Sequence, residues 1–345
     1  MSNTLSVSRD FADIDPQYTA IRAIADRSGV RPADPLAMPV DEARRAARSY
    51  HAIWTPQIPV LDHVDERTIT GPAGPIRLRL YVPGTQTAER RHLPVMVYFH
   101  GGGFVLNGLE THDGLMRLIA AEAGIAVCAV SYSLAPEHRF PIQLHEALAA
   151  IGWLRENAGE IGLDASRIAV GGDSAGANLA LSAILALRDA GRSPVAMAVL
   201  SYGMFAADFD TPSHRRFGGG QYGLTTERMR WYWQQYLGQQ GTPDDPRAAP
   251  LWADLRGLPP VMLIAAGADC LLDDSVRLAD RLTEADVPNR LSIHPGALHS
   301  FLQLAGHLDA ADRAIAEIAT GLREVLLAPR WPQQQIKRQR QRARR

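Results

Sequence analysis

Hydrophobic residues along this chain fall into short runs separated by longer amphipathic stretches. Between residues 65 and 82, apolar and polar residues alternate around a turn at 71–75, which is typical of a β-hairpin with one exposed face. Nearly continuous apolar runs follow, and a last short strand is predicted at 290–294; the runs lie at 95–99, 126–130, 168–170, 195–200 and 261–265. Continuous apolar runs of this length predict strands that are buried on both faces, as in a parallel sheet.

Stretches with helical spacing separate these strands. They lie at 114–123, 142–157, 175–190 and 275–285, and a long final helix is predicted at 305–327. Strands that alternate with helices indicate a doubly wound α/β sheet with right-handed crossovers.

Three segments depart from this rhythm. Residues 1–60 are rich in Ala, Arg and Pro and contain a predicted helix at 41–50 but no clear strand. An insertion at about 203–240 carries a glycine triplet and a cluster of aromatic residues, Trp231, Tyr232, Trp233 and Tyr236. We therefore predict an N-terminal helical segment at 1–60, an α/β domain at 61–330 that contains the insertion, and a basic, disordered tail at 331–345.

Composition narrows the function classes. Of the 345 residues, 46% are hydrophobic, which suffices for one large core. The last ten residues hold six basic residues, and the rest of the chain has 30 basic and 37 acidic residues, so we expect no nucleic-acid binding. The only lysine is Lys337, which excludes Schiff-base, Walker-loop and Ser-x-x-Lys chemistry.

The sequence shows no signal for export or for membrane insertion. The two cysteines do not make a disulfide framework, the start has no apolar signal region, and no run of about 18 apolar residues occurs. We therefore expect a cytoplasmic protein without a membrane span.

A nucleophile motif follows the strand at 168–170. Residues 172–176 read Gly-Asp-Ser-Ala-Gly and open the next predicted helix. Gly-x-Ser-x-Gly at a strand-to-helix turn is typical of a nucleophile elbow, in which Ser174 would occupy strained backbone beside a helix N-terminus. The motif alone is also compatible with a tight turn that carries no chemistry.

A glycine-rich loop, His-Gly-Gly-Gly-Phe at 100–104, follows the strand at 95–99. Glycines allow backbone N–H groups to point at a developing oxyanion, so we predict Gly101 and Gly102 as donors together with the N–H of Ala175. A phosphate-binding loop would need a following helix with Lys or Ser, and neither is correctly placed.

The fold expected for such a motif supplies an acid and then a histidine, in that order. Asp269 follows the strand at 261–265, whereas its competitors Asp273 and Asp274 are expected to cap the next helix. His299 lies in a loop after the last strand, whereas its rival His294 lies within that strand. Surface or packing roles are expected for His112, His138 and His145. We find no residues with metal-ligand spacing and expect no cofactor.

Taken together, these motifs resemble the hormone-sensitive-lipase-like family of bacterial carboxylesterases. The resemblance covers most of residues 60–327 and is carried by the blocks 100–104, 132–138 and 172–179 and by the Asp269 and His299 loops. Where this family usually has Pro and Gly, the chain has Cys270 and Ser300.

The resemblance implies an α/β-hydrolase fold, a mostly parallel eight-stranded sheet with helices on both faces and a helical cap made from residues 1–60 and the insertion. It implies a Ser174, Asp269 and His299 triad, with Gly101, Gly102 and Ala175 as oxyanion donors. It is also compatible with a homodimer through the last strand and helix.

Several functions would fit this constellation. We expect a carboxylesterase acting on small-molecule esters with short acyl chains, with a lactonase or an amide deacetylase as alternatives. A non-catalytic binding protein on the same scaffold is disfavoured because the chain keeps a candidate for each triad member. Two roles stay open for Trp231 and Trp233: lining the pocket, or packing the cap.

Overall fold

A computed structural model describes residues 14–54, 59–84, 92–192, 195–239 and 241–327 of the chain. The predicted tail at 331–345 and the first residues of the N-terminal segment lie outside these described ranges.

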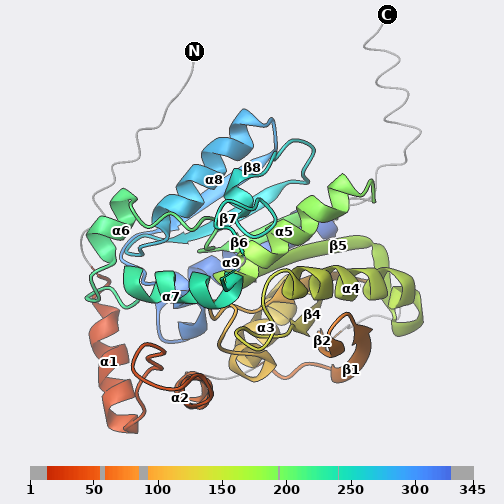
Figure 1. The fold of residues 1–345 in the computed structure, drawn as a ribbon. Helices are drawn as coiled ribbons and strands as arrows, with labels where there is room; N and C mark the ends of the chain where they lie inside the picture. The colour runs from red at the N-terminus through yellow and green to blue at the C-terminus, as the bar shows by residue number, and fades with distance from the viewer. Residues whose placement is uncertain (1–13, 55–58, 85–91, 193–194, 240, 328–345) are drawn as a thin grey trace, which may run out of the picture.

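One sheet of eight strands runs through the middle of the molecule, in the order β1-β2-β4-β3-β5-β6-β7-β8 (Figure 1). The strands are β1 His63–Gly71, β2 Gly74–Val82, β3 Leu93–Phe99, β4 Ala126–Ser131, β5 Leu163–Asp173, β6 Met197–Ser201, β7 Val261–Ala266 and β8 Asn289–His294. β1 and β2 form the predicted hairpin, and β2 is antiparallel to β4, whereas β3 to β8 are mutually parallel. The predicted mostly parallel α/β sheet is thereby confirmed.

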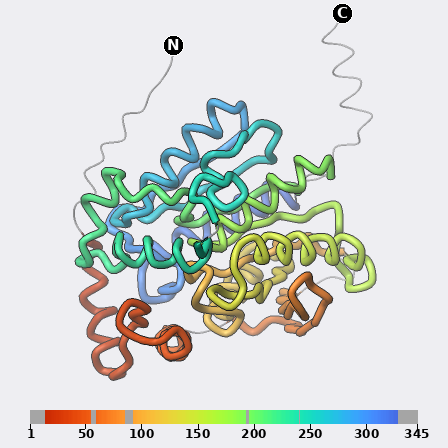
Figure 2. Tube along the Cα trace, viewed as in Figure 1, coloured from red at the N-terminus to blue at the C-terminus, as the bar shows by residue number. Residues whose placement is uncertain are grey.

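Helices cover both faces of this sheet, as Figures 1 and 2 show. Within the described residues they are α1 Gln17–Ser28, α2 Val40–Ile53, α3 Leu109–Ala123, α4 Ile142–Asn157, α5 Ala175–Asp189, α6 Pro212–Phe217, α7 Thr226–Leu237, α8 Leu272–Glu284 and α9 Asp309–Leu326. Three short 3-10 helices complete the structure, η1 Ala158–Ile161, η2 Pro250–Trp252 and η3 Phe301–Leu304.

The packing of the central strand β3 explains why its sequence is continuously apolar. Val95, Val97 and Phe99 belong to a core shared with α4, α5 and α8. Met96 and Tyr98 belong to a second core, shared with α3 and α9. Because successive side chains of a strand point to opposite faces, a strand covered by helices on both sides must be apolar throughout.

Two elements are clearly longer than predicted: β5 covers Leu163–Asp173 rather than 168–170, and α3 gains a turn for a local reason. α3 begins at Leu109 rather than at residue 114, because Thr111 Oγ1 bonds both the N–H and the carbonyl of Gly108. This pairing satisfies a free N–H at the helix N-terminus and adds a turn ahead of the apolar pattern.

The N-terminal helices lie beside the insertion after β6. α1 and α2 approach α7 on one side of the sheet (Figure 1), and residues of all three helices line a common cavity. An ion pair between Asp34 and Arg228, with 3.3 Å between oxygen and nitrogen, joins the α1–α2 connection to α7. This group of helices therefore stands over the loops that leave the carboxyl ends of the parallel strands, which is where α/β proteins form their sites.

Candidate active site

Ser174 stands at a sharp turn between β5 and α5. Its backbone has φ 53° and ψ −119°, a conformation that a non-glycine residue rarely adopts. The turn needs small neighbours, since a Cβ atom at Gly172 or Gly176 would overlap the carbonyl oxygen of Phe99 at the end of β3. The N–H of Ser174 donates to the carbonyl of Ser201 at 2.9 Å, which fixes the turn to β6.

Two further side chains from distant loops complete a hydrogen-bonded series with Ser174. The Oγ of Ser174 lies 3.0 Å from Nε2 of His299, and Nδ1 of His299 lies 2.7 Å from Oδ2 of Asp269. Asp269 is 1% exposed, and its other oxygen accepts the N–H of Leu271 at 3.1 Å. The ring of Tyr202 packs edge-on against the imidazole, with 5.1 Å between centroids, and so limits its rotation.

The competing acids bind elsewhere, and the expectation that they cap α8 is wrong. Asp273 accepts the N–H of Ser213 at 2.8 Å. Asp274 accepts the N–H groups of Phe205 and Ala206, at 2.6 and 3.1 Å. Both carboxylates therefore hold the segment that follows β6, because its backbone N–H groups need buried acceptors. The rival histidine, His294, is the last residue of β8 and is buried near Glu317.

The glycine loop after β3 requires a correction at Gly101. Its N–H donates to Oδ1 of Asp173 at 2.9 Å, so it is not available to an oxyanion. Gly102 and Gly103 line the same cavity as Ser174, and neither N–H makes a hydrogen bond with the described residues. The sequence prediction did not include Gly103, whose N–H is as free as that of Gly102 among the described residues.

A buried polar cluster anchors this loop and was not anticipated. Oδ1 of Asp173 also accepts the hydroxyl of Tyr98 at 2.9 Å and lies 3.1 Å from Nε2 of His112. Burial would raise the pKa of Asp173, but the charge of His112 and the bonds from His112 and Tyr98 outweigh it and lower that pKa. Burial, together with the charge of His112, lowers the pKa of His100 to about 4. His112 is 1% exposed, which rules out the expected surface role but leaves a packing role open.

Ser174 opens into a cavity of about 580 Å³, here called the Ser174 cavity. Its walls come from α1, α2, α7, the glycine loop and the His299 loop, and its apolar side chains include Ile21, Met204, Leu224, Met229, Tyr232 and Leu298. The side chains of Arg31 and Asp26, which pair at 2.7 Å and are largely exposed, mark an end that reaches solvent.

The aromatic residues of the insertion divide between two roles. Tyr222 and Tyr232 line the Ser174 cavity, whereas Trp231 and Trp233 do not. Trp233 is 2% exposed and packs against Tyr236, so packing accounts for this residue.

In the described ranges, no group of three or more His, Cys, Asp and Glu side chains is arranged to hold a metal ion. Burial raises the pKa of the Cys128 thiol to about 12 and raises that of Cys270 as well, so both thiols stay protonated at neutral pH. Among the described helices, none combines the length and the apolar character needed to cross a bilayer.

Comparison with known proteins supplies the remaining evidence. The sequence profile of a family described as alpha/beta hydrolase fold matches residues 96–303. Esterase LipI of Mycobacterium tuberculosis is 36% identical over 273 residues, covering 79% of this chain and 83% of the relative. An ethyl acetate hydrolase of Pseudomonas putida is 34% identical over 295 residues, covering 84% and 92%.

A solved structure supports the same relationship to esterases. The hyperthermophilic esterase of the archaeon Pyrobaculum calidifontis superposes with a TM-score of 0.84 at 33% identity, covering 92% of this chain and all of the other. The fold, the motifs and these likenesses agree with one another. The chain therefore belongs to the α/β-hydrolase family, in its hormone-sensitive-lipase-like group of bacterial carboxylesterases, and is a carboxylic ester hydrolase.

Proposed function

We propose that this enzyme hydrolyses esters of short-chain carboxylic acids through an acyl-enzyme on Ser174, with His299 as general base and Asp269 as its partner. The observation that carries the proposal is the continuous series from Ser174 Oγ to His299 to Asp269, at 3.0 and 2.7 Å. Such a series makes a weakly acidic hydroxyl nucleophilic, because the imidazole takes its proton as the bond to the acyl carbon forms.

Acylation would begin with attack of Ser174 Oγ on the ester carbon while its proton passes to Nε2 of His299. Asp269 holds the imidazole through Nδ1 and stabilises its charged form. The oxyanion would be met by the N–H groups of Gly102, Gly103 and Ala175, the last of these at the N-terminus of α5. His299 then returns the proton to the leaving alcohol, and water repeats the sequence on the acyl-enzyme.

A preference for short acyl chains is supported by the Ser174 cavity and by the relatives. The lining of the cavity includes the charged side chains of Arg22, Asp26, Arg31 and Arg228, against which a long hydrocarbon chain would pack unfavourably. The names of relatives include ethyl acetate hydrolase and acetyl esterase. We propose that α1, α2, α6 and α7 act together as a cap that sets this limit.

The position of β8 suggests how two copies of the chain would pair. β8 lies at one edge of the sheet, and its neighbour α9 leaves Val325 39% exposed. An edge strand offers unpaired backbone groups to a second chain, so we infer a homodimer through β8 and α9. Light scattering during gel filtration measures the mass in solution, and a monomeric mass would refute this assembly.

The acid and the nucleophile can be tested together. A fluorophosphonate should label Ser174 and lose its target in Ser174→Ala. Asp269→Asn should lower kcat by about 10³–10⁴-fold, as expected when a triad loses its carboxylate. Asp273→Asn is the matched control, because Asp273 is also buried but binds Ser213 rather than His299. A larger loss in Asp273→Asn than in Asp269→Asn would move the acid elsewhere.

Substrate class needs a separate measurement. A panel of p-nitrophenyl esters from acetate to laurate, with several lactones and aryl acetamides, should give its highest kcat/KM on the shortest esters. A maximum on laurate, on a lactone or on an amide would refute the proposed specificity while leaving the nucleophile in place.

A further inference from the structure

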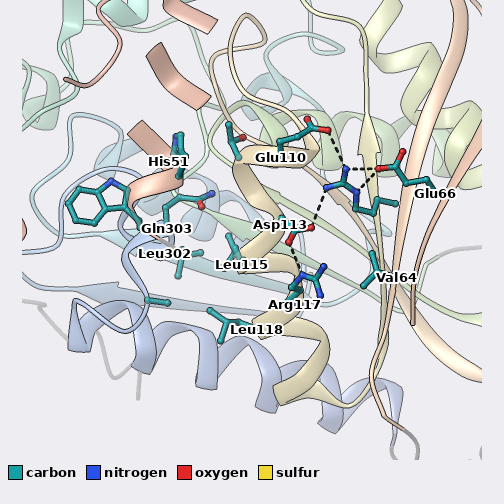
Figure 3. A pocket seen from close by; sticks show the side chains of 16 residues that line it. His51, Val64, Glu66, Glu110, Asp113, Leu115, Arg117, Leu118, Leu302 and Gln303 are labelled. Atoms are coloured by element: carbon teal, nitrogen blue, oxygen red, sulfur yellow. Dashed lines mark hydrogen bonds and ion pairs between the residues drawn. The ribbon is translucent and has the colours of Figure 1, made fainter. Parts of the chain in front are cut away.

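A second cavity, of about 540 Å³, borders the Ser174 cavity. It is lined by residues of α2, β1, β2, α3 and η3, and Figure 3 shows it from close by. The two cavities have three lining residues in common, namely His51, Trp54 and Gln303, here called the shared wall. Since each of these residues faces both spaces, the shared wall is the place where the cavities meet.

The shared wall is unusual in its hydrogen bonding. Twelve buried side-chain nitrogen and oxygen atoms have no protein partner in the described residues, and three of these belong to the shared wall: Nδ1 of His51, Nε1 of Trp54 and Nε2 of Gln303. Buried polar groups are normally satisfied by protein or by water, because an unmet group costs its full desolvation energy. Unmet polar atoms gathered on one wall are groups that bound water would satisfy.

The far side of the second cavity is charged and reaches solvent. Arg79 pairs with Asp113 and Glu110, each at 3.2 Å, and also with Glu66. In Figure 3 this group lies across the cavity from His51 and Gln303. The side chains of Glu66 and Glu110 are 48% and 51% exposed, so this end of the cavity meets bulk water.

The charged lining of the second cavity determines which kind of molecule can occupy it. An acyl chain or an apolar alcohol would lose free energy against a wall of ionised side chains, whereas water would not. Burial, reinforced by the charge of His112, lowers the pKa of His51 to about 4, so its ring is neutral at pH 7. A neutral imidazole has one donor and one acceptor nitrogen, which suits a chain of water molecules.

We propose that the second cavity and the shared wall form a water passage that supplies the hydrolytic water for deacylation of Ser174. The passage deepens the proposed function and rests on it. Water arriving past Gln303 attacks the acyl carbon and gives one proton to Nε2 of His299. The tetrahedral adduct then expels Ser174 Oγ, which recovers that proton, and the carboxylic acid leaves.

The passage predicts that water and a bulky alcohol reach the acyl-enzyme by different routes. With p-nitrophenyl acetate as donor and benzyl alcohol as acceptor, the ratio of acetate to benzyl acetate reports the competition. Gln303→Leu and His51→Leu remove polar atoms of the shared wall and should lower this ratio by about two- to tenfold, the equivalent of one lost hydrogen bond. Without benzyl alcohol, deacylation after the p-nitrophenol burst should slow by the same factor, and it should slow more than the burst itself.

Controls separate the passage from general damage. Leu118→Met alters the second cavity away from the shared wall and should keep the wild-type ratio. Gln303→Asn keeps an amide N–H donor and should give a ratio closer to wild type than Gln303→Leu does. Rates are expressed per fluorophosphonate-titrated site, so either leucine variant suffices if the other does not fold. An unchanged ratio in the leucine variants, or an equal slowing of burst and deacylation, overturns the passage, whereas a wild-type enzyme that forms no acyl-enzyme on Ser174 and transfers no acetyl group to benzyl alcohol contradicts the proposed function itself.

Discussion

The contact between the glycine loop and α7 yields a sharp prediction at Gly103. This residue has φ 61°, and a Cβ atom added there would overlap the ring of Tyr232 from α7. Gly191 has nearly the same backbone, φ 63°, but an added Cβ would meet nothing within 4 Å. The substitutions Gly103→Ala and Gly191→Ala therefore share the backbone cost, and only the first forces the glycine loop and the cap apart.

The expected magnitudes follow from these two geometries. Each alanine should lower the free energy of unfolding by about 1–2 kcal/mol, the cost of a left-handed conformation for a residue with a Cβ atom. Gly103→Ala should in addition displace one oxyanion donor, which is worth about 3–4 kcal/mol of transition-state stabilisation, or a fall in kcat/KM of about 10²–10³-fold. Gly191→Ala should leave kcat/KM close to wild type, because the residue follows the end of α5, far from Ser174.

Steady-state kinetics on p-nitrophenyl acetate and urea unfolding measure the two quantities. In the double variant Gly103→Ala/Tyr232→Ala the ring is gone, so kcat/KM should exceed the value expected from the two single variants combined. If Gly103→Ala keeps the kcat/KM of Gly191→Ala, then the N–H of Gly103 is not an oxyanion donor and the contact with Tyr232 has no catalytic consequence.

Three further predictions concern groups around the site. Asp173→Asn removes the charge that holds the N–H of Gly101 and should lower kcat by about tenfold with little change in KM, as steady-state kinetics would reveal; a change confined to KM would contradict the anchoring role. Burial raises the pKa of Asp274 to about 7 despite two N–H donors, so its contribution to stability is present below about pH 4 and is lost as the pH rises through 7. The free energy of unfolding, measured in urea, should therefore fall between pH 5 and pH 8, and it should fall further in the wild type than in Asp274→Asn. An equal fall in both proteins would refute the raised pKa of Asp274. Tyr18→Phe leaves the N–H of Leu298 without its acceptor and should cost about 1–3 kcal/mol of stability by urea unfolding, whereas an unchanged stability would show that this bond is replaced.

The fold was predictable because its signals are local and repeated. β3 and β7 are apolar throughout because helices cover both of their faces, and that pattern can be recognised in any window of the chain. Ser174, Asp269 and His299 could be nominated because each follows a predicted strand, and in a parallel sheet the carboxyl ends of the strands meet at one edge.

What escaped prediction depends on contacts between distant residues. Gly101 and Gly103 belong to the same glycine triplet, and the position of Asp173, 72 residues away from Gly101, decides which N–H is taken. His112 has the pattern of an ordinary helix residue, and its burial against Asp173 comes from the packing of α3 on the sheet. The functions of Asp273 and Asp274 likewise depend on the path of the segment after β6, which has no periodicity to indicate it.

The bond from the N–H of Leu298 to the hydroxyl of Tyr18, at 2.9 Å, joins residues 280 positions apart. During translation, at about 5–20 residues per second, the first helix therefore waits roughly 15–60 s for its partner loop to be synthesised. His299 is made immediately after Leu298, so a ribosome-bound or prematurely terminated chain that ends before this loop contains the serine but no base. On the proposed mechanism, a chain that stops before His299 would therefore not hydrolyse esters, even if Ser174 and the first helix were already in place.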